Sequence, residues 1–126
     1  MSRRGIYANG YYPHNFHFLS FAASMTGRSR MAIDAARETA KRLGVDAVRA
    51  VPWMESVTPI VPLTLVTLGR WAEILAEPHP GDSLPFFTGM TWYARGVAHA
   101  ALGVGAAARR ELAKVVPIAE GYPANE

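Results

Sequence analysis

Two histidines near the start of the chain have the residue type and spacing of metal ligands. His14 and His17 are three positions apart at the expected start of a helix, so both imidazoles can lie on one side of it. A divalent metal ion accepts two imidazoles at this spacing and needs one or two further ligands. His99, Glu55 and Asp34 are candidates for these. One hypothesis is therefore a metal- or small-ligand-binding protein, with or without catalytic activity, that uses His14, His17 and His99.

The competing interpretation of the two histidines is structural, and we favour it. His14 then helps to cap the helix, and His17 packs against a neighbouring helix. No carboxylate lies close to either residue in the sequence, and two histidines alone are a weak metal signal. We therefore expect no cofactor, with a divalent metal ion as the alternative.

The remaining sequence lacks the patterns of known catalytic sites. The chain has no cysteine, which excludes disulfides, thiolate catalysis and cysteine zinc sites. Its serines, histidines and acids form no nucleophile elbow or zincin motif, and the Gly103–Gly105 segment lacks the Lys-Ser/Thr of a phosphate loop. The net charge of +3 is spread along the chain, so nucleic acid is an unlikely partner. A binding protein is favoured over an enzyme.

Composition and hydropathy predict one domain without a membrane segment. Half of the 126 residues are apolar, enough for a buried core. The most apolar stretch, residues 57–68, is short and contains Pro59 and Pro62, whereas a membrane span needs about 20 apolar residues. The N-terminus has no apolar run typical of a signal peptide. We expect a cytoplasmic protein.

The apolar spacing predicts that helices position these side chains. Asn15 is the expected N-cap of the first helix, and Gly44 the residue that ends the second. Residues 45–51 fit either a short helix or a link. The predicted helices are 15–25, 29–43, 71–76, 84–102 and 106–116, and one more that begins between Pro59 and Pro62 and ends at residue 68. A loop is predicted at 77–83, and Pro117 is expected to end the last helix.

Three glycines separate these helices in pairs. Gly69 and Gly103 are 34 residues apart, and Gly27 and Gly69 are 42 apart, which is one such period with an insertion. A period of 34 is typical of a helix–turn–helix repeat whose units stack to bury their apolar faces.

On these residues the chain resembles the tetratricopeptide repeat (TPR) family. That family's large residue, small residue, turn glycine and second small residue fall on Phe16, Ser20, Gly27 and Ala32 in one unit, and on Trp92, Gly96, Gly103 and Ala108 in another. The middle unit departs from the pattern, because Pro62 and Ile74 replace small residues and Pro78 shortens its second helix. We expect that unit to be distorted.

The resemblance implies an all-α solenoid of stacked antiparallel helix pairs that binds a protein or peptide. It implies one domain over residues 1–126, with units at about 13–44, 52–78 and 84–117 and flexible segments at 1–10 and 118–126. Polar side chains on the first helix of each unit would then face the binding groove. The expected ligand-binding residues are Asn15, His17, Arg95, His99 and the exposed Trp53; the alternative for Arg95 is a surface ion pair, and Trp71 and Trp92 are expected in the core.

Both ends of the predicted stack are unusually apolar. The first helix carries Phe16, Phe18, Leu19 and Phe21 all around it, and no further amphipathic helix is expected to cover the helix at 106–116. Helical repeats normally end in polar capping faces. We therefore expect these ends to associate, either with another copy in a homo-oligomer that forms through its terminal helices or with a further part of a longer chain.

Overall fold

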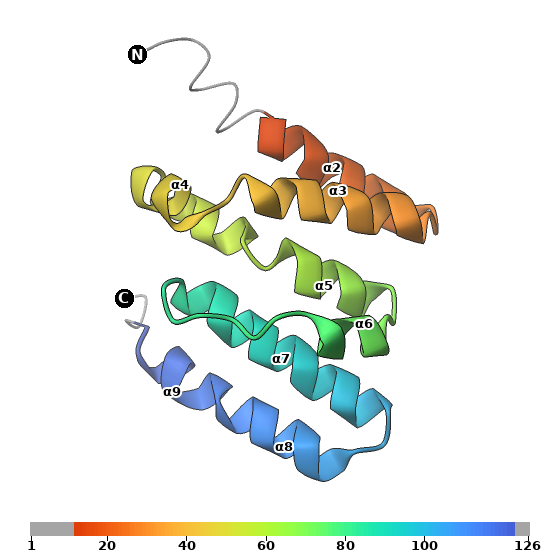
Figure 1. The fold of residues 1–126 in the computed structure, drawn as a ribbon, viewed down its shortest axis with the longest axis vertical. Helices are drawn as coiled ribbons and strands as arrows, with labels where there is room; N and C mark the ends of the chain where they lie inside the picture. Colours follow the sequence, from red (N-terminus) through yellow and green to blue (C-terminus); the bar gives the residue numbers. More distant parts are fainter. Residues whose placement is uncertain (1–11, 123–126) are drawn as a thin grey trace.

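The computed structural model describes residues 12–122, and every regular element in that range is helical. Figure 1 shows the helices stacked along the long axis, with α2 and α3 at one end and α8 and α9 at the other. The predicted all-α fold is confirmed. The elements are α2 (Tyr12–Met25), α3 (Ser29–Lys41), α4 (Val45–Ala50), the 3-10 helix η2 (Pro52–Val57), α5 (Ile60–Thr67), α6 (Trp71–Ala76), α7 (Pro85–Ala101), α8 (Gly105–Ala113) and α9 (Val115–Glu120).

The same turn joins α2 to α3, α5 to α6 and α7 to α8. Its glycine has a positive φ, 73° at Gly27, 68° at Gly69 and 80° at Gly103. In each turn this glycine donates its N–H to the carbonyl three positions back, and the next residue donates to the carbonyl five positions back, which is a Schellman motif. The following helix begins at the second residue after each glycine. The three pairs therefore share the same turn, as the glycine spacing predicted, although the middle pair, α5 and α6, has the shortest helices, in keeping with the expected distortion of that unit.

Small residues let the helices of a pair approach closely. Ser20, seven positions before Gly27, is buried and donates from its Oγ to the carbonyl oxygen of Ala32 at 2.9 Å. Gly96 occupies the same position relative to its own turn glycine. A Cβ added there would lie 2.7 Å from Leu112 Cδ2 and 3.5 Å from the carbonyl oxygen of Ala108. Both small-residue positions have the packing role that the sequence indicated.

The main core lies between α3, α5, α6 and α7. Leu65, Ala94 and Ala98 are completely buried at its centre, and Trp71 packs against its edge. Helix α5 packs against α3, α6 and α7, so it connects the two ends of the stack. The buried members of this cluster are Ile33, Ala36, Ile60, Val61, Leu65, Ile74, Ala94 and Ala98.

The structure corrects the predicted beginning of the first helix. Helix α2 starts at Tyr12, so Asn15 is an exposed residue within it and not its N-cap. Pro13 stands at the second helical position, where its missing N–H costs no intrahelical hydrogen bond.

The structure also corrects the predicted end of the last helix. Helix α8 ends at Ala113, and Pro117 lies in the first turn of α9, where proline is tolerated. Helix α9 packs on α7 and α8, and a Cβ added at Gly89 of α7 would lie 3.3 Å from Ile118 Cγ2. Residues 118–120 are therefore helical and not a flexible tail, and α9 partly covers the end that was expected to be open. The predicted flexible segment 1–10 lies outside the described residues.

The link after α3 contains two short helices. Residues 45–50 form α4, and η2 follows with Pro52 in its first turn. Glu55 of η2 accepts a hydrogen bond from the backbone N–H of Phe86 at 3.1 Å. Glu55 thereby caps the start of α7. This structural role accounts for the position of the Glu55 carboxylate, which the sequence had suggested as a further metal ligand.

None of the helices between residues 12 and 122 is both long and apolar enough to cross a membrane.

Candidate functional site

A groove of about 360 Å³ runs between α2, η2 and α5. Its walls combine apolar side chains with serine and threonine hydroxyls, and His17 is its one titratable group. Phe21 and Met25 at its rim are exposed, 64% and 74% respectively. Such a surface can take apolar side chains of a partner and offers acceptor oxygens along its edge. The lining residues are His17, Ser20, Phe21, Ser24, Met25, Ser56, Val57, Ile60, Leu63, Thr64 and Thr67.

The hydroxyls of this groove are held by the helices that carry them. Thr67 Oγ1 donates to the carbonyl of Leu63 at 2.9 Å, and Ser56 Oγ donates to the carbonyl of Trp53 at 2.8 Å. Their lone pairs remain able to accept from a partner. The groove is therefore uncharged when His17 is neutral, and a hydrogen-bond donor is its best polar match.

Three of the predicted site residues line one smaller pocket. His14 and His17 of α2 and Trp53 of η2 meet at a pocket of about 260 Å³, together with Thr39, Leu43, Met54 and Val57. Burial lowers the pKa of His17, and the positive charge of His14 lowers it further. A lowered pKa keeps His17 neutral at pH 7, the state that can accept a hydrogen bond or bind a metal.

Residues 12–122 do not complete the metal site that was considered as the alternative. Among residues 12–122, no three histidine, acidic or cysteine side chains lie close enough to hold a metal ion together. His14 instead makes an edge-on ring contact with Phe18, with centroids 4.7 Å apart. The first turn of α2 and the last turn of α7, which carries His99, lie on opposite sides of the fold in Figure 1. His99 is therefore not brought to the pair.

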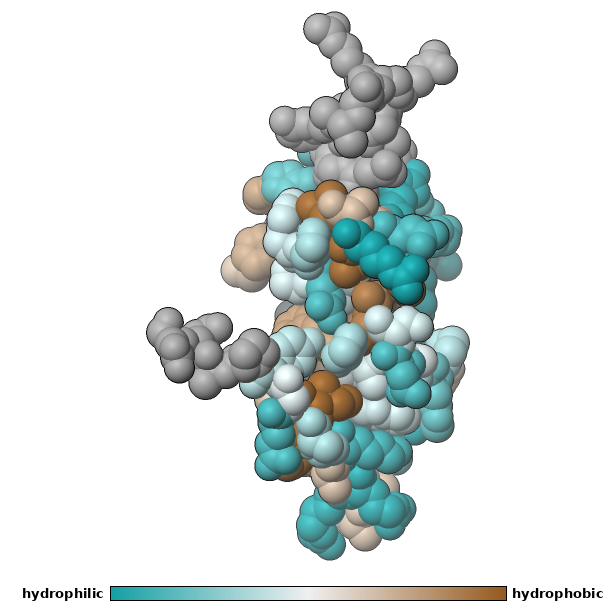
Figure 2. All heavy atoms as spheres, turned by 90° about the vertical axis from the view of Figure 1, so that its left-hand side faces the viewer, coloured by the Kyte–Doolittle hydropathy of each residue, from teal (hydrophilic) through white to brown (hydrophobic). Residues whose placement is uncertain are grey.

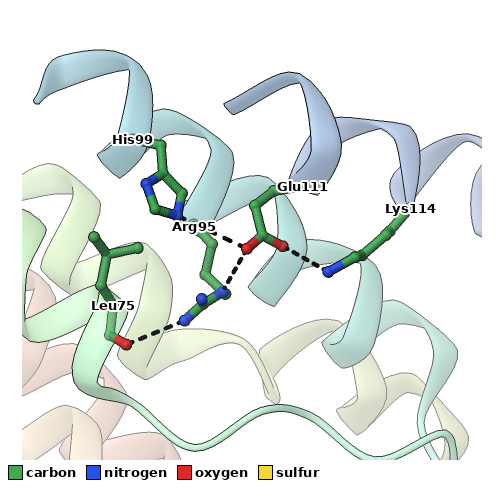
Figure 3. Close-up of polar contacts among 5 residues, drawn as sticks. All are labelled: Leu75, Arg95, His99, Glu111 and Lys114. Atoms are coloured by element: carbon green, nitrogen blue, oxygen red, sulfur yellow. Dashed lines mark hydrogen bonds and ion pairs between the residues drawn. The ribbon is translucent and has the colours of Figure 1, made fainter. Parts of the chain in front are cut away.

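Arg95 and His99 belong to a different cluster, centred on Glu111 of α8 (Figure 3). Arg95 Nε donates to Glu111 Oε1 at 3.2 Å, and its Nη1 donates to the carbonyl of Leu75 at 3.1 Å. His99 Nε2 lies 3.8 Å from the same Glu111 oxygen, and Lys114 Nζ donates to the other one at 3.1 Å. The Arg95 and Glu111 side chains are only 11% and 10% exposed. Arg95 thus holds a carboxylate of its own chain.

The charges of this cluster set the pKa of Glu111. Burial acts to raise that pKa, but the hydrogen bond from Lys114 and the charge and hydrogen bond of Arg95 outweigh it. The pKa of Glu111 therefore lies below its usual value, and the carboxylate is charged at neutral pH. Lys114 also lies over the half-buried Trp92, with Nζ 4.0 Å from the ring centroid. The cluster ties α6, α7 and α8 together.

A third pocket, of about 400 Å³, lies under the proline-rich loop and was not predicted. Its walls are mostly apolar, with Val61, Ile74 and Phe87 among them. Arg37 of α3 pairs with Glu77 of the loop beside it. These two residues are 40 positions apart, so no local pattern indicates the pair. The sequence predicted the loop at 77–83 but not the pocket beneath it.

The hydrophobic surface of the fold is divided. On the face viewed in Figure 2, hydrophobic residues form separate patches along the long axis, among hydrophilic ones. The most exposed large apolar side chains are Met25, Trp53, Phe21 and Phe18, and three of these four lie on α2. Exposed apolar groups of this size are typical of binding surfaces.

The fold and its grooves define an all-helical protein of antiparallel helix pairs. Comparisons with protein families, with curated proteins and with solved structures find no match to this chain.

Proposed function

We propose that this protein is a TPR-like helical scaffold that binds a protein or peptide segment in the groove between α2, η2 and α5. The observation that carries the proposal is the groove itself, about 360 Å³ in volume and open between the first helices of two pairs. The repeated Schellman turn supports the family resemblance, because the same turn joins the two helices of each pair.

The chemistry of the groove indicates the kind of segment it binds. Val57, Ile60 and Leu63 offer apolar contact, and the groove contains no Asp, Glu, Lys or Arg. A charged side chain would lose its water there without gaining a counter-ion. The best partner is therefore a segment with two or more apolar side chains and uncharged polar groups beside them. Its affinity should change little with salt.

A selection from a displayed random-peptide library on the immobilised protein tests this proposal. Thr67→Arg places a long charged side chain in the groove and should weaken the selected peptides at least tenfold. Thr26→Arg is a matched control, because Thr26 is also exposed and also donates to the carbonyl four positions back, but lies outside the groove. Peptides that bind the Thr67→Arg variant as tightly as the wild type would contradict the proposal.

A second candidate function rests on the pocket that joins His14, His17 and Trp53. The two imidazoles can ligate a divalent metal ion, and the indole offers a surface on which a small aromatic ligand can pack. Calorimetric titration with Zn²⁺ tests it: His14→Ala and His17→Ala should each abolish the binding, whereas His79→Ala, in the exposed loop, should not. A wild-type protein that takes up no Zn²⁺ would remove the metal from this candidate.

A further inference from the structure

Helix α2 presents a narrow apolar stripe on the side that faces away from the core. Phe18, Phe21 and Met25 are 61%, 64% and 74% exposed. With His14 they follow spacings of four, three and four residues, the pattern by which two helices pack side by side. The same helix buries Ser20 and Ala23 on its inner side. The stripe is therefore a second contact face and not part of the core.

The stripe has the charge properties of a surface that can meet its own copy. Helix α2 contains no Asp, Glu, Lys or Arg. Packing α2 against α2 through this stripe therefore brings no Asp, Glu, Lys or Arg of α2 into the contact, and His14 is the stripe's one titratable side chain. The two copies would bury about 200 Å² for each fully covered large side chain, which gives about 400 Å² per copy at these exposures. The total, about 800 Å² over both copies, is below the roughly 1,200 Å² of specific stable interfaces, so the dimer would be weak and transient.

The other end of the stack is a poorer match for this stripe. Helix α9 already packs there on α7 and α8. The neighbouring surface of α8 exposes Arg109 and Arg110. Head-to-tail stacking would desolvate these cations against a helix that has no carboxylate to pair with them. Such stacking would also continue without limit, whereas pairing of identical faces closes at two copies.

We propose that the protein forms a twofold-symmetric dimer in which α2 of one copy packs on α2 of the other through Phe18, Phe21 and Met25. The inference rests on the proposed role as a protein-binding scaffold and identifies one partner as a second copy of this chain. The interface is self-complementary, and the end formed by α8 and α9 takes no part in it.

Sedimentation velocity over a concentration series of the full chain tests the association. The wild type should move from monomer to dimer and stop there. Phe18→Glu should weaken the dimer at least tenfold, and Phe18→Ala should weaken it less, because it removes area without adding charge. Val116→Glu is the control, since Val116 is 54% exposed on α9 and should leave the dimer unchanged. Circular dichroism confirms that each variant is folded.

The absence of cysteine allows a direct test of the symmetry. Ala22→Cys on the exposed face of α2 should be crosslinked to its own copy by a short bismaleimide, and Ala113→Cys on α8 should not. A mixture of the two variants that crosslinks to each other would indicate head-to-tail stacking and overturn the proposal. A wild type that stays monomeric at millimolar concentration would also overturn it.

Phe21 and Met25 belong both to the stripe and to the rim of the groove, whereas Phe18 belongs only to the stripe and Thr67 only to the groove, so these last two residues separate the two proposals. Phe18 does not line the groove, so Phe18→Glu should lose the dimer and keep peptide binding. Thr67→Arg should do the reverse. If Thr67→Arg loses peptide binding while the wild type remains a monomer, the proposed function stands and the dimer is wrong.

Discussion

Ser20 Oγ donates a 2.9 Å hydrogen bond to the carbonyl oxygen of Ala32, and this buried bond joins α2 to α3. The same hydroxyl lies 3.4 Å from Thr64 Oγ1 of α5. One small polar side chain therefore connects α2, α3 and α5, which are the walls and support of the proposed binding groove.

Substitutions at Ser20 should separate the hydrogen bond from the packing. Ser20→Ala loses the bond but keeps the volume, so we expect a loss of about 1 kcal/mol in the free energy of unfolding. Ser20→Leu forces α2 and α3 apart and should cost about 2 to 3 kcal/mol. Urea denaturation measures both. Equal effects of the two substitutions would show that the site is not tightly packed.

Gly96 provides a test of the equivalent position in the last pair. Gly96→Ala should cost about 1 kcal/mol in spite of alanine's better helix propensity, because its Cβ meets Leu112 Cδ2 at 2.7 Å. In a Leu112→Ala background the contact is gone, so the same substitution should become neutral or stabilise by about 1 kcal/mol. A double-mutant cycle by denaturation measures this coupling. A coupling near zero would mean that the Leu112 side chain turns aside freely.

The three turn glycines should respond alike to substitution. Alanine at Gly27, Gly69 or Gly103 is strained by the positive φ and should cost about 1 kcal/mol in each case. Gly81→Ala is the control, because a Cβ there meets nothing within 4 Å and its φ is not positive. Thermal or urea unfolding compares the four variants. A much smaller loss at one turn would show that the pairs are not equivalent.

Glu111 should make the stability of the fold depend on acid pH. Because the pKa of its carboxyl is lowered in the folded state, its contribution is complete above the usual glutamate range and is lost as the pH falls through the folded pKa. Glu111→Gln should therefore cost about 2 kcal/mol at pH 7 and flatten the loss of stability below pH 4.5.

Unfolding measured between pH 3 and pH 7 checks the Glu111 prediction. Glu38→Gln is the control, because Glu38 pairs with Lys41 and Arg42 at the exposed surface and should change the profile much less. A Glu111→Gln profile parallel to that of the wild type would contradict the role given to this carboxylate.

Local signals predicted most of the helices, because the residues that start and stop them act on their own backbone. Gly69 and Gly103 marked two turns, and the prolines and glycine of residues 77–83 marked the loop. The predictions at Asn15 and Pro117 were wrong because proline does not break a helix at its start. In the first turn of a helix it removes no hydrogen bond. The prediction at Gly44 was also wrong, because α3 ends at Lys41 and Gly44, with φ of −74°, is the N-cap of α4.

The candidate sites were predicted less completely, because their members come from distant parts of the chain. The sequence singled out His14, His17 and Trp53, and the structure brings these three to one pocket. It also singled out Arg95 and His99 but gave no sign of Glu111, which holds both from the next helix. The hydroxyls of the groove carried no distinguishing pattern at all.

The sequence by itself determined the helix pairs, since Gly27, Gly69 and Gly103 act through backbone conformation that needs no distant partner. It also determined that α2 is uncharged. Tertiary structure alone decided which side of α2 faces solvent, that α9 packs on α7 and α8, and that Arg95 is held by Glu111. These depend on how helices far apart in the chain share the core around Leu65, where the gain comes from burying area jointly and not from any single segment.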